Sequence, residues 1–184
     1  MTKISPLTKK ILRRFLKKVG DTLTGQWLLL GGTVLPLLGR EYRVTTDIDL
    51  VGLGLKEQKQ ILSLMKVAEQ LKLPIESINQ AAGYFLRKTG FQQRDLIVLH
   101  QGKSATIFRP SCFLFIQLKL QRLSDTDLKD CLEYLKFCHN KKEPLAKRSL
   151  LKLITKEIKT SDSIHKIKRF QILENAVQHY KHTI

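Results

Sequence analysis

The chain has 184 residues, of which 42% are hydrophobic and 27% are charged, a size and composition typical of a globular protein with one well-packed core. No apolar run approaches the length of a membrane span, which argues against a membrane-spanning protein. Thirty-three Lys and Arg against sixteen Asp and Glu give a net charge of +17, which favours polyanionic partners, with nucleic acid first and an acidic protein or membrane surface second.

A helix is predicted near the N-terminus, with Ser5 as its N-cap, Pro6 at its first helical position and its end at Gly20. One of its faces is apolar, and the opposite face carries only basic residues, among them Lys10, Arg13, Arg14, Lys17 and Lys18. Because a solvated helix face usually mixes both signs of charge, we expect these residues to bind nucleic acid. An amphipathic targeting sequence or a membrane-surface helix is the alternative.

An apolar run at 27–30 predicts a strand, after which two glycines, a short helix and a loop lead to a second strand that starts at Asp47. Side chains alternate between the faces of a strand, so Asp47 and Asp49 should point the same way while Ile48 and Leu50 point into the core. Two carboxylates held this close repel each other unless a cation neutralises them, and oxygen ligands suit Mg²⁺. We therefore expect Asp47 and Asp49 to share a divalent cation.

The glycines between these strands, Gly31 and Gly32, supply the other half of the pattern. A Gly-Gly turn followed by Thr33 at the start of a helix lets backbone N–H groups approach a phosphate, and the helix N-terminus adds a favourable potential. Alone, a Gly-Gly pair is usually only a turn, and a D-x-D pattern is usually a solvated loop or an exposed strand edge. In this order, with Arg43 between them, the two halves predict a nucleotide site.

Further along, apolar periodicity predicts a helix at 55–73 that Pro74 ends, and a second helix that Gly90 ends. The inner side of that second helix is expected to consist of Ile78, Ala81, Ala82 and Phe85. Strands are predicted at 94–99 and 105–108, joined by a turn at 101–103.

Two apolar helices follow, one at 111–123 and one capped by Ser124. In the first of them Lys119 shares a face with apolar residues, so its ammonium must either reach outward along its stem or point into a cleft at a fixed anion. In the second, Asp127 and Asp130 should face away from the packed side, where they are solvated or paired with nearby lysines.

The cysteines Cys112, Cys131 and Cys138 are odd in number and lack C-x-x-C spacing. We expect reduced, buried thiols rather than a zinc site, and therefore a reducing compartment such as the cytoplasm.

The composition becomes more basic after residue 140, over two predicted helices at about 144–159 and 163–181. We therefore expect two domains: residues 1–140, including the basic N-terminal helix, and a basic helical extension at 141–184.

The Gly31-Gly32 turn, the short helix and the pattern R-x-T-x-D-I-D-L from Arg43 to Leu50 resemble the nucleotidyltransferase-fold superfamily. They resemble in particular its minimal bacterial members related to the AbiEii-like toxins of type IV toxin–antitoxin systems. The segments 75–86 and 90–94 are similar to the part that links the metal strand to the later strands in that group. Lys119, followed by Asp127 and Asp130, is similar to its lysine-bearing helix and acidic follow-on, so the match covers about residues 25–138.

This resemblance implies an α/β (α+β) fold, with a small mixed sheet flanked by helices and a helical C-terminal extension. It implies that Asp47 and Asp49 are catalytic and bind Mg²⁺ or Mn²⁺. The residues expected to bind the triphosphate of an NTP are Gly31, Gly32, Thr33, Arg43 and Lys119.

Lys119 is also expected to be catalytic, and Arg122 is a weaker candidate for the same contact. A third carboxylate, as general base or third metal ligand, would be Asp95. The alternative for Asp95 is a solvated strand-end residue paired with Arg94.

The expected function is transfer of a nucleotidyl group from an NTP to an acceptor hydroxyl, with pyrophosphate leaving. RNA, such as a tRNA end, is the expected acceptor, since a chain of charge +17 is a poor surface for cationic aminoglycosides. The resemblance also implies a toxin with an antitoxin partner. Two alternatives stay open: a catalytically weak nucleic-acid-binding protein of the same fold, and an enzyme that transfers AMP to proteins.

Overall fold

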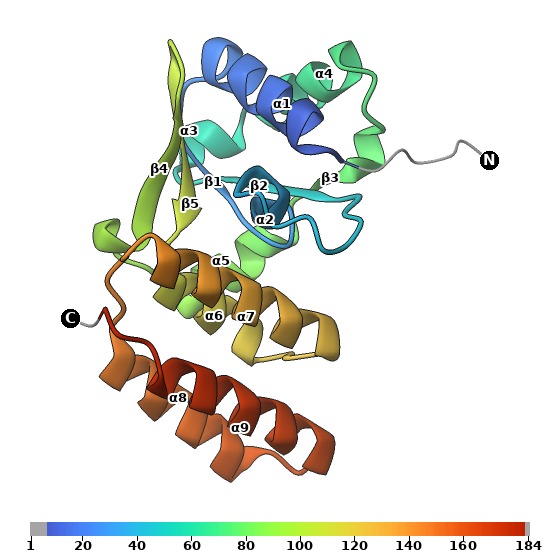
Figure 1. Ribbon diagram of the computed structural model, residues 1–184. Helices are drawn as coiled ribbons and strands as arrows, with labels where there is room; N and C mark the ends of the chain where they lie inside the picture. Colours follow the sequence, from blue (N-terminus) through green and yellow to red (C-terminus); the bar gives the residue numbers. More distant parts are fainter. Residues whose placement is uncertain (1–6, 183–184) are drawn as a thin grey trace. The chain divides into compact units, whose positions relative to one another are not determined.

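The computed structural model describes residues 7–182, which form two compact units (Figure 1). Unit 1 ends at Pro110 and unit 2 begins at Ser111. Packing thus divides the chain earlier than the change in composition near residue 140, which falls inside unit 2. The basic extension expected at 141–184 packs together with the two helices that precede it.

Unit 1 is built on a sheet that has five strands within the described residues, in the order β3-β2-β1-β5-β4. The strands are β1 (Gly25–Leu29), β2 (Ile48–Gly52), β3 (Ile78–Asn79), β4 (Leu96–Gln101) and β5 (Ala105–Pro110). β1 runs antiparallel to β2 and parallel to β5, β2 runs parallel to β3, and β4 and β5 form an antiparallel hairpin. The expected small mixed sheet is therefore confirmed.

The helices of unit 1 cover this sheet. They are α1 (Lys9–Thr22), α2 (Val34–Leu37), α3 (Leu55–Gln58), α4 (Ile61–Gln70) and α5 (Ala82–Thr89), with 3₁₀ turns η1 (Ile75–Ser77) and η2 (Gln93–Asp95). α1 packs against β4, β5 and α4, while α5 packs against β2 (Figure 1). The core includes Trp27, Leu28, Ile48 and Leu50, all fully buried.

The start and end of α1 differ from the prediction. The helix is capped by Thr8, whose side chain accepts a hydrogen bond from the backbone N–H of Ile11. Ser5 and Pro6 lie outside the described residues. Gly20 does not end the helix, which runs on to Thr22; a Cβ at Gly20 would lie 2.9 Å from the Cα of Gly102. This glycine lets the helix approach the β4–β5 hairpin rather than terminating it.

The helix predicted at 55–73 is two helices, α3 and α4, because Gln60 interrupts it. The Gln60 side chain accepts from the N–H of Thr24 at 2.9 Å and donates to the Thr24 carbonyl at 3.3 Å, which anchors this point to the residues before β1. The helix predicted after Pro74 is also shorter. Ile78 belongs to β3, and α5 buries Gly83 and Leu86, whereas Phe85 is 46% exposed.

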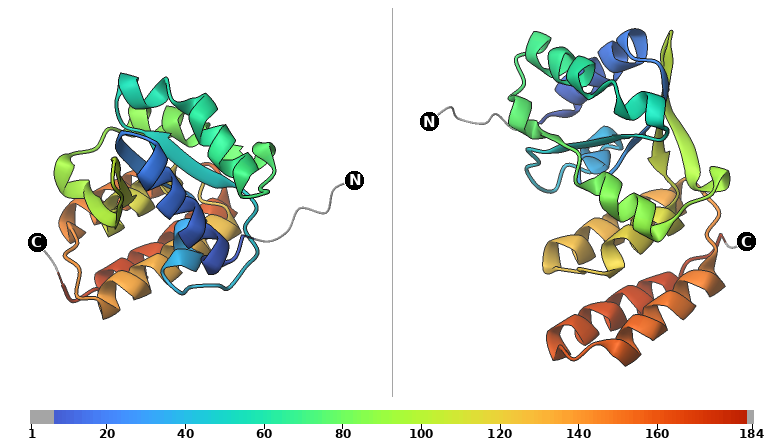
Figure 2. Two further views of the ribbon diagram at one scale, coloured as in Figure 1. Left: turned by 90° about the horizontal axis from the view of Figure 1, so that it is seen from above. Right: turned by 180° about the vertical axis from the view of Figure 1, so that it is seen from behind.

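Unit 2 contains α6 (Cys112–Leu120), α7 (Asp125–Asn140), α8 (Lys147–Thr160) and α9 (Ile164–Gln178). α6 packs on α7, and α8 lies beside α9 (Figure 2). The predicted cap of α7 at Ser124 is confirmed, and so are the two helices of the basic extension, as α8 and α9.

The core of unit 2 holds the Phe115 ring stacked on the Tyr134 ring, with centroids 4.0 Å apart. All three cysteines fall within the described residues, are free and are buried, as expected. Burial raises the pKa of the Cys131 thiol, which stays protonated at neutral pH. Within residues 7–182 every helix is too short or too polar to serve as a membrane span.

Candidate functional site

The turn between β1 and α2 brings several of the predicted residues together. The backbone N–H of Leu30 donates to the Asp49 carbonyl at 2.7 Å, and the chain then turns at Gly31, where φ is +64°. A Cβ at Gly31 would lie 1.8 Å from Oδ2 of Asp49, and a Cβ at Gly32 would lie 2.0 Å from Nη2 of Arg43. A side chain at either position would displace the carboxylate or the guanidinium that lies against the backbone of the turn, and at Gly31 it would also meet the positive φ.

The same turn offers backbone donors. Among the described residues, the N–H groups of Gly31 and Gly32 donate to no protein acceptor. Two successive backbone N–H groups beside a guanidinium are donors of the kind that can bind phosphate oxygens.

Thr33 lies next to this turn with its side chain fully buried. Its hydroxyl donates to the carbonyl oxygen of Asp47 and thereby ties the start of α2 to the residue before β2. Since α2 has only four residues, its dipole adds little. The hydroxyl of Thr33 has a structural partner, so a nucleotide contact from Thr33 would use its backbone.

Asp47 and Asp49 take the arrangement that strand alternation predicts. Ile48 and Leu50 are fully buried, Asp49 is half-buried in β2, and Asp47 is exposed just before the strand. The hydroxyl of Thr46 donates to Oδ1 of Asp47 at 3.2 Å. Asp49 therefore points away from the buried side chains of Ile48 and Leu50, and Asp47 is open to solvent next to the start of β2.

These residues fit a hard divalent cation. Both donors are carboxylates of the type that Mg²⁺ and Mn²⁺ bind, and Asp47 is open to solvent. Among residues 7–182 no three His, Cys, Asp or Glu side chains gather in a way that could hold a metal. A cation here would complete its shell with water and with oxygens of a bound phosphate, as Mg²⁺ commonly does.

Asn79 is a site residue that the sequence did not reveal. β2 and β3 pair in parallel with Asp49 opposite Asn79, and Nδ2 of Asn79 donates to Oδ1 of Asp49 at 2.6 Å. Oδ1 of Asn79 accepts from the N–H of Ala81 at 3.0 Å, which sets the orientation of the amide. Asn79 thus positions the carboxylate of Asp49, as outer-shell partners do at metal sites.

Asp95 is not brought to this place. It lies in η2, before β4, and its Oδ2 accepts from the backbone N–H of Gln92 at 2.8 Å as part of a capping box. β4 is separated from β2 by β1 and β5. The described residues do not assemble Asp95 with Asp47 and Asp49.

Lys119 lies in unit 2, where its ammonium meets carboxylates of the protein itself. Nζ is 2.9 Å from Oδ1 of Asp127 and 2.8 Å from Oδ2 of Asp130, and the three side chains are 11%, 1% and 0% exposed. The expectation that Asp127 and Asp130 face away from the packed side was wrong, although pairing with a lysine is confirmed. Both carboxylates are buried because cations neutralise them there.

Arg122 completes this cluster, with Nε 2.6 Å from Oδ2 and Nη2 2.8 Å from Oδ1 of Asp127. Burial by itself would raise the pKa of Asp127, but hydrogen bonds from Arg122, Lys119 and Ser124 outweigh it and hold that pKa well below its usual range. Burial would likewise lower the pKa of Lys119, and the charges of Asp130 and Asp127 raise it instead. Asp127 and Lys119 therefore stay ionised at neutral pH. A triphosphate contact by Lys119 or Arg122 remains a prediction.

The basic face of α1 is exposed as predicted. The residues concerned are Lys10, Arg13, Arg14, Lys17 and Lys18. On the other side of the helix Leu12, Phe15 and Val19 are fully buried. Because the apolar stripe is used in the core of unit 1, only the cationic side of α1 is available to a partner.

Comparisons of the chain with family models, with curated proteins and with solved structures gave no match.

Proposed function

We propose that the protein is a metal-dependent nucleotidyltransferase that moves a nucleotidyl group from an NTP to a hydroxyl of an RNA acceptor such as tRNA. One observation carries the proposal. The carboxylate of Asp49 and the guanidinium of Arg43 are held against two successive glycines whose N–H groups donate to no acceptor within residues 7–182. A turn that only reverses the chain does not require a carboxylate and a guanidinium at its backbone. A triphosphate with its cation requires both, because the carboxylate binds the cation and the guanidinium and N–H groups bind phosphate oxygens.

Each residue then has a chemical task. Asp47 and Asp49 would hold Mg²⁺ or Mn²⁺, which when bound neutralises charge on the phosphate oxygens. The N–H groups of Gly31 and Gly32 donate to a phosphate oxygen, and Arg43 offsets the negative charge that builds up on the leaving pyrophosphate. Asn79 keeps Asp49 in position.

The reaction balances without a further reagent. The oxygen of the acceptor hydroxyl forms a bond to the α-phosphorus while the bond from that phosphorus to the pyrophosphate oxygen breaks. Pyrophosphate leaves with the bonding electron pair, and the hydroxyl proton passes to water. The protein's share is mainly positioning and electrostatic stabilisation.

RNA is the acceptor class that the charge distribution favours. The exposed cations of α1 form a face without an acidic residue between Lys9 and Lys18, and such a face attracts a phosphate backbone. A role as a toxin that is held in check by an antitoxin protein rests on the resemblance in sequence alone.

The test is transfer of radiolabel to RNA. The purified protein, Mg²⁺, total RNA and each α-labelled NTP in turn should give labelled RNA with at least one nucleotide. Asp49→Asn should abolish the label, while Asp162→Asn, the same change at an exposed carboxylate of unit 2, should leave it. No label with any NTP and any RNA, or full activity in Asp49→Asn, would refute the proposal.

A second candidate is a nucleic-acid-binding protein that keeps the nucleotide site without turnover. It is favoured by one observation, that the described residues do not assemble a third carboxylate with Asp47 and Asp49. Metal-dependent NTP binding without any labelled product would select this candidate.

A further inference from the structure

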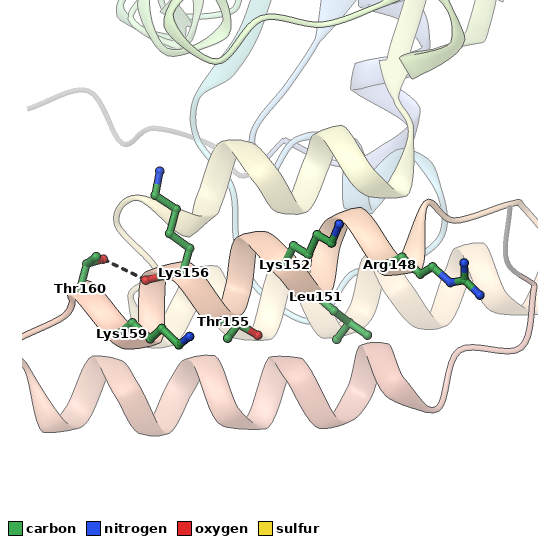
Figure 3. A pocket seen from close by; sticks show the side chains of 7 residues that line it. All are labelled: Arg148, Leu151, Lys152, Thr155, Lys156, Lys159 and Thr160. Carbon is green, nitrogen blue, oxygen red and sulfur yellow. Dashed lines mark hydrogen bonds between the residues drawn. The ribbon is translucent and has the colours of Figure 1, made fainter.

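A groove of about 720 Å³ runs along α8 in unit 2 (Figure 3). Four of its lining residues are cations, Arg148, Lys152, Lys156 and Lys159. The others are Leu151, Thr155 and Thr160, so the whole lining comes from one helix.

The cations form a row. Arg148, Lys152 and Lys156 follow one another at intervals of four residues, about one helical turn and a rise of ~6 Å each. Figure 3 shows the side chains of Arg148, Lys152 and Lys156 spaced along the helix, while Lys159 lies on the lower side of the helix in this view, beside Thr155. A linear array of positive charges at this interval matches a linear polyanion better than a compact anion.

The four groove cations differ from some other cations of unit 2, whose side chains hold the helices together. Lys147 donates to the carbonyls of Gln178 and Tyr180, Lys166 donates to the carbonyl of Gln121 at 2.7 Å, and Arg169 contacts Leu123 and Asp125. By contrast, the side chains of the four groove cations make no hydrogen bond or ion pair with any other residue in the described part of the chain.

One carboxylate lies close to the groove. Oε1 of Glu174, on α9, accepts a hydrogen bond from the hydroxyl of Thr155 at 3.1 Å. Glu157 is on α8 itself but does not line the groove. The lining therefore keeps a strong positive excess.

The packing of α8 argues against a lipid surface as the partner. A helix that lies on a membrane inserts an apolar face beneath its basic residues. The apolar residues Leu150 and Ile154 of α8 are fully buried in unit 2, and Leu151 is the one apolar residue in the groove. The hydroxyls of Thr155 and Thr160 donate to Glu174 and to the Lys156 carbonyl, so the groove offers mainly positive charge, which is what a phosphate backbone requires.

From these observations we infer that the α8 groove binds the sugar–phosphate backbone of an RNA strand. The inference deepens the proposed function, and it rests on that function for the identity of the strand as the acceptor. Binding at α8 requires no catalysis by unit 1, so the two can fail separately.

The experiment measures binding of fluorescein-labelled oligouridylate to the full chain over a range of salt concentrations. Uridine stacks weakly, so this probe reports mainly on backbone contacts. The variant Arg148→Gln/Lys152→Gln/Lys156→Gln removes three contacts, and each single-strand contact contributes about 0.7 to the slope of log K against log salt. We expect the slope to fall by about 2 and the affinity at about 0.1 M salt to fall by about a hundredfold.

A matched control makes the same change in net charge within unit 2. Lys129, Lys136 and Lys168 are exposed, lie outside the groove and are replaced together by Gln. This control should keep the native slope. Equal losses in the two triple variants would show that bulk charge alone binds the strand and would overturn the inference.

Two further measurements test whether the variant has lost its fold and whether the groove binds lipid instead. If the triple variant loses its helical circular dichroism, Lys152→Gln and Lys156→Gln are measured singly, and each should lower the slope by about 0.7. Vesicles of phosphatidylserine and phosphatidylcholine are then tested in place of the oligonucleotide. Loss of vesicle binding by the α8 variants, with oligonucleotide binding unchanged, would assign the groove to a membrane and overturn the inference.

Failure of the proposed function has a different signature. Asp49→Asn should bind the oligonucleotide with the native slope even though transfer is lost, and the α8 variant should bind NTP normally. If the native protein has no transferase activity but the α8 variant shows the expected fall in salt slope, the proposed function is refuted and the inference about the groove stands.

Discussion

Two pairs of aspartates in this chain have opposite environments. Asp127 and Asp130, in unit 2, are buried and lie within 3 Å of the ammonium of Lys119. Asp47 and Asp49, in unit 1, lie at the start of a strand, the first exposed and the second half-buried against a glycine turn. The buried pair is neutralised by cations of the protein and holds α6 to α7. In the pair of unit 1 Asp47 is exposed, and we propose that a cation from solution binds there.

The largest expected effect comes from removing the ammonium that neutralises the buried pair, Asp127 and Asp130. Lys119→Met keeps most of the bulk of the side chain but leaves two buried carboxylates without their ammonium. We expect the free energy of unfolding to fall by about 3 to 5 kcal/mol, measured by urea denaturation. Lys129→Met, at an exposed position of α7, should stay within about 0.5 kcal/mol of the native protein. An unchanged stability in Lys119→Met would mean that the ammonium is free for another anion.

The second effect concerns Asn79, the hydrogen-bond partner of Asp49 in unit 1. Asn79→Ala removes the amide that donates to Asp49, and loss of such a second-layer partner typically costs about 10- to 100-fold in metal affinity. Calorimetric titration with Mn²⁺ measures it. Gln80→Ala is the matched control, because the Gln80 amide donates to the Leu50 carbonyl instead of a carboxylate. Equal affinities in the two variants would remove Asn79 from the site.

A third, smaller effect separates backbone strain from the site itself. Gly31→Ala and Gly39→Ala both place a side chain at positive φ, +64° and +78°, and each should cost about 1 kcal/mol of stability. A Cβ at Gly31 also meets Asp49, whereas one at Gly39 meets only Nζ of Lys9 at 3.7 Å. Metal-dependent nucleotide binding should therefore be lost in the first variant alone, as a fluorescent NTP analogue would reveal.

The smallest expected effect is a pH dependence of the free energy of unfolding that arises from Asp127 of the buried pair. The pKa of Asp127 is lowered in the folded protein, so its ionised form contributes stability above the unfolded value of about 3.9, and this stability is lost as the pH falls through the folded pKa. Asp127→Asn should lose less stability than the native protein between pH values of about 4 and 2. Parallel curves from urea unfolding at stepped pH would contradict the assignment.

Local signals in the sequence predicted several elements in both units. The apolar run before Gly31, the alternation from Asp47 to Leu50 and the cap at Ser124 each depend on neighbours within a few residues, and each is confirmed. The basic face of α1 belongs to the same class, because helical periodicity alone decides which side chains are exposed.

Features that depend on distant contacts were missed. Gln60 breaks the predicted helix because it reaches Thr24, and Asn79 meets Asp49 only through the register of β2 and β3. The burial of Asp127 could not be predicted from its own helix, where a charged residue usually faces solvent, because its partner Lys119 comes from α6. The same limit applies to the boundary at Pro110, which is set by packing instead of composition.

The central claim is that the pair in unit 1 takes its cation from solution. Binding of each NTP is measured by calorimetry with and without Mg²⁺, in the native protein, in Asp47→Asn/Asp49→Asn and in Asp125→Asn/Asp162→Asn, where Asp125 is 82% exposed and Asp162 is also exposed. The prediction is that Mg²⁺ tightens binding in the native protein and in the Asp125/Asp162 variant but has little effect in the Asp47/Asp49 variant. Equal enhancement by Mg²⁺ in all three proteins would contradict the claim.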